Sequence, residues 1–255
     1  IHYIIGIIIA ITITGYFVWQ AQQAKADIYG SSLVGWWRFD TNDDLDGVTL
    51  DRSGSGNNGT LKNIATSTFY SFGKIGQGFN FDGTNDYVDL GNPASLQITG
   101  AITLATWVRF DTLAVGEDIL NREGGSSDRG YRLVKEADNT IRCNVGTAPT
   151  TTFGLTAATV AVANTWTHLA CVFTPSTSIA IFINGVQDNI NTTSPPASQR
   201  VATAGPDIGT RNNDVGLTLD GSMDDVRVYN RALSANEIAQ LYNMGQTQFH
   251  SFGDF

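Results

Sequence analysis

The chain has 255 residues, of which 42% are hydrophobic, and it carries 24 acidic against 15 basic side chains. Its net charge of -9 and its pI near 4.6 leave no basic surface to neutralise phosphate groups, so we exclude nucleic acid as a partner. The length suits one large β domain with a short additional segment.

Residues Ile1 to Trp19 form an apolar run without formally charged side chains, and Gln20 to Ala26 continue it with residues that favour helix. As a helix the run would span roughly 28 Å at ~1.5 Å per residue, which is about the thickness of the hydrocarbon core of a bilayer. We therefore expect a long N-terminal hydrophobic α-helix over residues 1–29. Such a helix must be buried in a membrane or against copies of itself.

This segment resembles the N-terminal helix of type IV pilin-like subunits, which packs in the core of a filament. Those subunits usually carry Glu at the fifth position, where this chain has Ile5. The resemblance implies that copies of the chain assemble through this helix, with the membrane as its environment before assembly. The alternative, from the length alone, is a membrane anchor that holds a single copy at the cell surface.

From Gly30 onward the pattern changes to short apolar or alternating stretches separated by Gly, Asn, Asp, Ser and Pro. Stretches of this kind that are rich in Thr, Val, Ile and aromatic residues favour β-strands. Many brief strands separated by turns predict an all-β jelly-roll sandwich of two antiparallel sheets over residues 30–245. The expected strands are Leu33–Asp40, Gly78–Phe81, Asp86–Leu90, Ile102–Phe110, Tyr131–Val134, Thr140–Val145, Trp166–Phe173, Ile179–Asn184, Gly216–Leu219 and Asp224–Tyr229.

One short helix is predicted near the end of the domain. Ser234 and Glu237 have the spacing of a capping box, and the apolar stripe of Ile238 and Leu241 follows them. Gly245 is expected to end this helix. An aromatic tail over residues 246–255 then closes the chain, and it could contact its own domain or a neighbouring subunit.

Cys143 and Cys171 are the only cysteines, and their spacing indicates neither a zinc cluster nor a disulfide framework. They can form a bridge if they lie on neighbouring core strands, and otherwise they are buried free thiols.

Several phrases of the domain recur in a known order. They are LVGWWRFD at 33–40, GNNGTL at 56–61, FDGTNDYV at 81–88, WTHLA at 166–170, IFING at 181–185 and DDVRVYNRALS at 224–234. Together they resemble the laminin G-like (concanavalin A-like) jelly-roll domains of bacterial surface proteins, over about Leu33 to Gly245. The resemblance implies a two-sheet sandwich used for carbohydrate or protein recognition, commonly with a bound calcium ion.

Loops rich in Asp and Gly supply the carboxylate and backbone oxygens that Ca²⁺ prefers. In related sandwiches a structural ion ties the first strand, a Gly turn and an Asp of the last strand together. The resemblance therefore implies a structural calcium held by Asp40, by the carbonyl group of Gly83 and by Asp225. The alternative is that the aspartates of these loops only stabilise turns and strand ends.

Glucan hydrolases share this fold, and they carry their carboxyl groups on one strand in a Glu-x-Asp-x-x-Glu pattern. None of the glutamates of this chain stands in that pattern; they are Glu117, Glu123, Glu136 and Glu237. We therefore expect no catalysis, with a degenerate glycosidase as the alternative.

Ligand contacts on a rigid β scaffold come from loops, and two polar loops are candidates here. They supply Asn121 and Arg122, and Arg211 and Asn212, although either loop could simply be solvated. The strand tryptophans are expected in the core; they are Trp36, Trp37, Trp107 and Trp166. Together these features predict an extracellular, cell-surface adhesion protein that binds a glycan or another surface protein.

Overall fold

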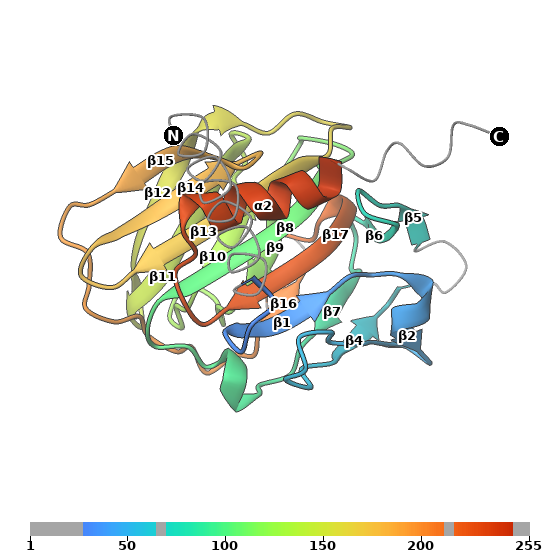
Figure 1. Cartoon of the computed structure of the whole chain (residues 1–255), viewed down its shortest axis with the longest axis horizontal. Helices are drawn as coiled ribbons and strands as arrows, with labels where there is room; N and C mark the ends of the chain where they lie inside the picture. Colours follow the sequence, from blue (N-terminus) through green and yellow to red (C-terminus); the bar gives the residue numbers. More distant parts are fainter. Residues whose placement is uncertain (1–27, 65–69, 212–216, 247–255) are drawn as a thin grey trace, which may run out of the picture.

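The computed structural model of the chain describes residues 28–64, 70–211 and 217–246. The predicted N-terminal helix, up to residue 27, and the aromatic tail, from residue 247, lie outside the described residues. Within them the strands form two antiparallel sheets that pack face to face (Figure 1). This arrangement confirms the prediction of an all-β sandwich.

The first sheet contains β1 (Leu33–Trp37), β5 (Tyr70–Phe72), β6 (Gln77–Asp82), β8 (Ile102–Phe110), β13 (Thr167–Thr174), β14 (Ser178–Ile183), β15 (Val186–Asn191) and β17 (Asp220–Tyr229). Among the described residues it is an eight-stranded sheet in the order β15-β14-β13-β8-β17-β6-β5, with β1 paired to β17.

The second sheet contains β2 (Asp44–Leu45), β3 (Val48–Thr49), β4 (Gly59–Lys62), β7 (Tyr87–Asp89), β9 (Glu117–Asn121), β10 (Arg132–Lys135), β11 (Thr140–Ala148), β12 (Thr151–Val160) and β16 (Asp207–Ile208). In the described part of the chain it is a nine-stranded sheet in the order β12-β11-β10-β9-β16-β7-β4-β3-β2. Two short 3-10 helices, η1 (Thr41–Asp43) and η2 (Ala94–Leu96), lie in the connections.

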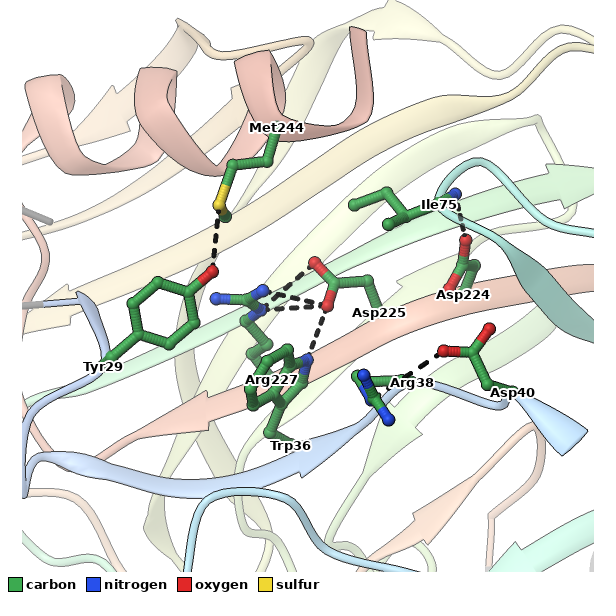
Figure 2. Close-up of a pocket in the computed structure, with 9 residues that line it drawn as sticks. All are labelled: Tyr29, Trp36, Arg38, Asp40, Ile75, Asp224, Asp225, Arg227 and Met244. Atoms are coloured by element: carbon green, nitrogen blue, oxygen red, sulfur yellow. Dashed lines mark hydrogen bonds and ion pairs between the residues drawn. The ribbon is translucent and has the colours of Figure 1, made fainter. Parts of the chain in front are cut away.

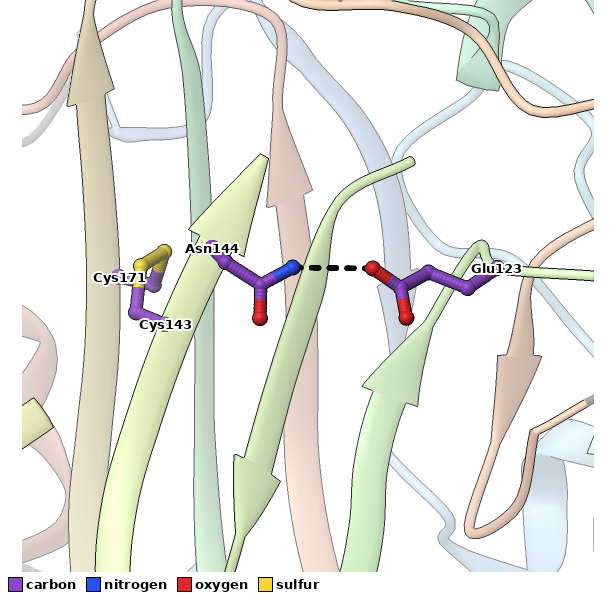
Figure 3. The surroundings of a disulfide bond; sticks show 4 residues. All are labelled: Glu123, Cys143, Asn144 and Cys171. Atoms are coloured by element: carbon purple, nitrogen blue, oxygen red, sulfur yellow. Dashed lines mark hydrogen bonds between the residues drawn. A yellow bond between two sulfur atoms is a disulfide. The ribbon is translucent and has the colours of Figure 1, made fainter. Parts of the chain in front are cut away.

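The main hydrophobic core fills the space between the two sheets. Alternate residues of each strand point inward, so that Leu104 and Val108 of β8 face Leu133 of β10 and Ile141 of β11 within one buried cluster. A disulfide bond crosses this core and joins Cys143 of β11 to Cys171 of β13, with their Cα atoms 5.8 Å apart (Figure 3). The sequence left the pairing of these cysteines open, and the structure resolves it as a bridge between the sheets.

The helix α2 (Ala235–Gln246) packs on the outer face of the eight-stranded sheet (Figure 1). The predicted capping box is present, because the backbone N–H of Ser234 donates to the Glu237 carboxylate at 2.8 Å. The helix continues one residue past the predicted end at Gly245, where a Cβ atom would lie 2.6 Å from the ring of Trp107. Glycine here therefore permits close packing and does not end the helix. None of the helices within the described ranges is long and apolar enough to cross a bilayer.

Candidate functional site

A cavity of about 210 Å³ opens on the outer face of the eight-stranded sheet, beside the C-terminal half of α2 (Figure 2). Its walls come from β1 and the residues after it, from β17, from the loop between β5 and β6, and from α2. The lining residues are Tyr29, Trp36, Arg38, Asp40, Ile75, Asp224, Asp225, Arg227 and Met244.

A β-bulge in β17 places two successive carboxylates in this cavity. Met223 and Val226 both belong to the core between the sheets, whereas strict alternation would direct only one of them inward. The pairing of β17 with β8 shifts register after Asp224, and Asp225 adopts a left-handed conformation with φ 53°. Asp224 and Asp225 therefore both face outward.

A second left-handed residue flanks the cavity at the end of β1. Phe39 has φ 57°, and its ring is buried in the core, stacked on Phe79 at 4.3 Å between ring centroids. The neighbours of Phe39 in the chain, Arg38 and Asp40, reach the cavity. Left-handed backbone is unfavourable for a bulky residue, and such strained positions cluster at functional sites.

Arg227 is the central group of the cavity wall. Its guanidinium is 2% exposed and forms an ion pair with Asp225 at 3.0 Å. It stacks on the rings of Trp36 and Tyr29, at 4.4 and 5.3 Å from the ring centroids. Stacking on Trp36 follows from the register, because Trp36 of β1 lies directly opposite Arg227 of β17. Burial alone would lower the pKa of Arg227, but the charge of Asp225 outweighs it and the pKa lies above its ordinary value.

Asp225 is fully engaged. Besides both contacts with Arg227, one of its oxygens accepts a hydrogen bond from the indole N–H of Trp36 at 2.5 Å (Figure 2). The carboxylate therefore holds a guanidinium and an aromatic ring in one arrangement, which fixes the shape of the cavity wall.

Asp224 is buried beside it without such a partner. Its side chain is 0% exposed, and the backbone N–H of Ile75 donates to Oδ2 at 2.6 Å. Oδ1 has no hydrogen-bond partner among the described residues. Burial is the main cause that raises the pKa of Asp224 well above its ordinary value, and the nearby charge of Asp225 adds to it.

Arg38 and Asp40 form the opposite rim of the cavity. The guanidinium of Arg38 donates through two nitrogens to Asp43, at 2.7 and 2.9 Å. Asp40 Oδ1 accepts a hydrogen bond from the backbone N–H of Gln77 at 3.0 Å. Asp40 Oδ2 lies 3.8 Å from Arg38 Nε, too far for a hydrogen bond. One oxygen of Asp40 is thus available toward the cavity.

The three residues predicted to hold calcium are not brought together. Asp40 and Asp225 line the cavity, whereas Gly83 lies in the turn after β6, where its carbonyl group accepts the hydroxyl hydrogen of Thr218 at 2.9 Å. The register places this turn about six residues from Asp225 along β17, or roughly 20 Å.

The oxygens of Asp225 are also taken by Arg227 and Trp36, so this donor set does not fit a calcium ion as predicted. In the described part of the chain no group of three or more His, Cys, Asp or Glu side chains could hold a metal ion. Calcium binding by the domain stays a prediction.

Of the predicted ligand contacts, Asn121, Arg122 and Arg211 do not line this cavity. Asn121 is 1% exposed and donates to Asp118 at 2.9 Å, while Arg122 donates to Asn92 at 2.6 Å. Both side chains are buried, and Nε and Nη1 of Arg122 have no hydrogen-bond partner among the described residues. Arg211 is half-buried and Asn212 lies outside the described residues. Their role in binding stays a prediction.

Trp36 and Arg227 were not predicted as site residues, although the sequence carries a signal for both. Trp36 and Trp37 are adjacent in one strand and so must face opposite sides; Trp37 is in the core and Trp36 is half-buried at the cavity. Arg227 alternates with Val226 and Val228, which assigns it to the outer face. The prediction that all four strand tryptophans pack in the core is thus wrong for Trp36, and it is also wrong for Trp166, which is half-buried and precedes β13.

The glutamates take part in structural ion pairs. Glu117 lies 3.1 Å from Lys135 with both side chains fully buried, and Glu237 contacts Arg231 at α2. Glu123 accepts from Arg129 at 2.7 Å and from Asn144 at 3.0 Å (Figure 3). Glu136 lies 4.0 Å from Arg132 at the surface. No glutamate lines the cavity described above.

Comparison with protein families gives one match. A model described as the concanavalin A-like lectin/glucanases superfamily matches residues 82–239, more than half of the chain. No curated protein matches the sequence.

Among solved structures, the binding domain of Paraclostridial Mosquitocidal Protein 1 is similar with a TM-score of 0.64 at 16% identity, covering 83% of this chain and 52% of that one. Domain 4 of AbnA, a GH43 extracellular arabinanase from Geobacillus stearothermophilus solved with arabinotriose, has a TM-score of 0.62 at 22% identity, covering 83% and 98%. The ligand binding domain of botulinum neurotoxin serotype D, solved with N-acetylneuraminic acid, has a TM-score of 0.58 at 14% identity. This match covers 83% of the present chain and 50% of the toxin domain. The chain spans about half the length of the toxin domains. At these identities the likeness shows the fold.

Proposed function

Because this chain belongs to the concanavalin A-like lectin/glucanases superfamily, we propose that its β domain is an extracellular, non-catalytic recognition domain that binds a glycan. The observation that carries the proposal is the cavity of the outer face, where a bulge and two left-handed residues bring aromatic rings and carboxylates together. Strain of this kind persists only where the surrounding structure holds it.

The chemistry of the cavity suits a sugar. A pyranose or furanose ring has apolar C–H faces that pack on aromatic rings, and hydroxyl groups that need hydrogen-bond partners. Tyr29 is 42% exposed and offers a ring at the mouth, and Asp224 and Asp40 offer carboxylate oxygens inside. A volume of about 210 Å³ is below that of pockets for drug-sized ligands, so the cavity suits one sugar unit.

An extracellular setting is supported by the disulfide bond. Structural disulfides persist in oxidising compartments and are rare in the cytosol, and the bridge between Cys143 and Cys171 lies in the core of the domain. The related arabinanase is extracellular by its description. Both observations favour a domain that works outside the cell.

The absence of catalysis remains part of this proposal and is supported by the glutamates. Each of them forms an ion pair in the described structure, and none lines the cavity. Of the aspartates that line it, Asp225 is held by Arg227 and Trp36. Incubation with β-glucans, scored for new reducing ends, tests this part: new ends would contradict it.

We also propose that the apolar segment 1–29 assembles copies of the chain into a filament, with a single membrane anchor as the alternative. The end of this segment is held firmly by the domain, since Ile28 is buried and its carbonyl group accepts the hydroxyl hydrogen of Tyr229 at 3.0 Å. Electron microscopy separates the two: ordered fibres support assembly, and detergent-soluble monomers contradict it.

Glycan binding is tested with a glycan array probed by the full chain in a detergent without sugar groups. We expect binding to a defined set of glycans and a loss of roughly 2- to 13-fold for Tyr29→Ala, since a stacked ring contributes about 0.5–1.5 kcal/mol. Val186→Ala, at a residue of β15 that is 70% exposed and does not line the cavity, is the control. A blank array, or equal binding by Tyr29→Ala, contradicts the proposal.

A further inference from the structure

We infer that the outer-face cavity selects an uncharged sugar unit, which donates hydroxyl hydrogens to Asp224 and Asp40, and that it rejects sugars carrying a carboxylate. The inference rests on the proposed function, because it names the class of sugar that this same cavity takes. It follows from which hydrogen-bonding groups of the cavity are already used and which are not.

The charged donors of the cavity are already paired with carboxylates. Both arginines on its wall are held by carboxylates, Arg38 by Asp43 and Arg227 by Asp225. The indole N–H of Trp36 is also taken, because it donates to Asp225. A ligand carboxylate could reach only the remaining N–H groups of these arginines, whose charges Asp43 and Asp225 already balance, or it would have to displace one of these aspartates.

The acceptors of the cavity are available. Asp224 Oδ1 is buried without a hydrogen-bond partner among the described residues, and Asp40 Oδ2 has only the distant contact with Arg38 at 3.8 Å. Figure 2 shows both carboxyl groups on the same side of the cavity, Asp224 below Ile75 and Asp40 beside Arg38. Buried polar groups in native proteins are normally satisfied, so the orphaned oxygen of Asp224 indicates that a bound molecule supplies the missing donor.

Sugar hydroxyl groups match this need, and a carboxylate does not. A hydroxyl group donates one hydrogen to an acceptor and still accepts from water or another group. A carboxylate can only accept, and it would bring a further negative charge into a cavity lined by three aspartates and two arginines. The cavity therefore discriminates against acidic sugars for two reasons: their carboxylate is repelled by the aspartates, and it leaves the acceptor oxygens without a donor.

Asp224→Asn is a sharp probe of this arrangement. The backbone N–H of Ile75 needs an acceptor at the Oδ2 position, so the amide oxygen takes that place and the amide NH₂ group takes the place of Oδ1. For the ionised carboxylate, the variant thus replaces the free acceptor by a donor at nearly constant volume. Asp220→Asn on the same strand is the control, because Asp220 lies outside the cavity and accepts from Thr112 at 2.8 Å.

The test measures the binding of methyl glycosides to the full chain by NMR, in a detergent without sugar groups. The neutral probes are the glycosides of glucose, galactose, mannose and arabinose, and the acidic probes are those of glucuronate, galacturonate and N-acetylneuraminate. We expect at least one neutral probe to bind more than tenfold tighter than every acidic probe. Asp224→Asn should lower the affinity for that neutral probe about tenfold and reduce the difference in affinity between neutral and acidic probes. Asp220→Asn should change neither the affinity nor the difference. EDTA should leave the binding unchanged.

Three results overturn the inference: an acidic probe that binds as tightly as the best neutral one, unchanged binding by Asp224→Asn, or loss of neutral binding in EDTA. The last result would show that a cation fills the carboxylate oxygens. Failure of the proposed function is distinct, because then neither class of probe binds and the glycan array is blank.

Discussion

The buried ion pair of the cavity wall gives the most quantitative prediction. Asp225→Asn removes the negative charge that faces Arg227, whose side chain is 2% exposed. Asparagine tolerates the left-handed backbone at this position and can still accept the hydrogen bond of Trp36. The change therefore isolates the charge, and it leaves the shape of the bulge and the aromatic contact in place.

Breaking a buried ion pair by removing one partner costs about 3–5 kcal/mol, because the remaining charge stays buried without compensation. Stacking of Arg227 on Trp36 and Tyr29 persists in the variant, so we expect the lower end, about 3 kcal/mol. Arg227→Met in the Asp225→Asn background removes the uncompensated charge and should restore at least about half of this loss.

The chain offers a matched control at its surface. Arg109 and Asp111 stand in the same two-residue spacing, with 2.7 Å between nitrogen and oxygen, but both side chains are 34% exposed. Asp111→Asn should therefore cost less than about 1 kcal/mol. The free energies of unfolding come from urea titration at constant m-value. If Asp225→Asn and Asp111→Asn lower the free energy of unfolding by the same amount, the ion pair in the cavity wall is not buried as described.

Replacing Cys143 and Cys171 together by Ala should lower the free energy of unfolding by roughly 3–4 kcal/mol, because the bridge closes a loop with a sequence separation of 28 and so restricts the unfolded chain. A loss below about 1 kcal/mol would count against the bridge. Burial lowers the pKa of His168 to about 4, so the unfolded state binds more protons and stability falls as pH drops from about 6.5 toward 4. In urea titrations the wild type should lose about 2 kcal/mol more than His168→Phe between pH 7.5 and pH 5, and equal losses would refute this. For the structural calcium implied by the family resemblance, EDTA should lower the Tm by several degrees, and an unchanged Tm would contradict it.

The sequence predicted those parts of the fold whose signal is local. The strand Ile102–Phe110 appears with its predicted bounds, because its long apolar run is buried on both faces, between the sheets and beneath α2. The capping box of Ser234 and Glu237 was likewise readable from spacing alone. By contrast, β12 was missed because Ala157 is its only buried residue, so the strand shows no hydrophobic alternation.

Local sequence patterns could not predict the cavity, because it depends on pairing between strands that are distant in the sequence. Nothing in the sequence Met223 to Arg227 shows that a bulge directs Asp224 and Asp225 to one face, since this follows from the register of β17 against β8. The predicted strand Gly216–Leu219 failed for a related reason. Its described part, from Leu217, lies outside β17, which begins at Asp220. Hydrogen bonds from neighbouring loops to Leu219 decide this boundary.

The indole N–H resonances of the full chain report whether a glycan occupies the outer-face cavity. Trp36 and Trp37 are neighbours in the sequence, but Trp36 lines the cavity and Trp37 is buried in the core, where its N–H donates to the backbone carbonyl group of Asn57 at 2.9 Å. On titration with the strongest glycan from the array, we expect the Trp36 resonance to shift with saturation while that of Trp37 stays in place. Saturable shifts confined to the nine-stranded sheet, with Trp36 unchanged, would contradict it.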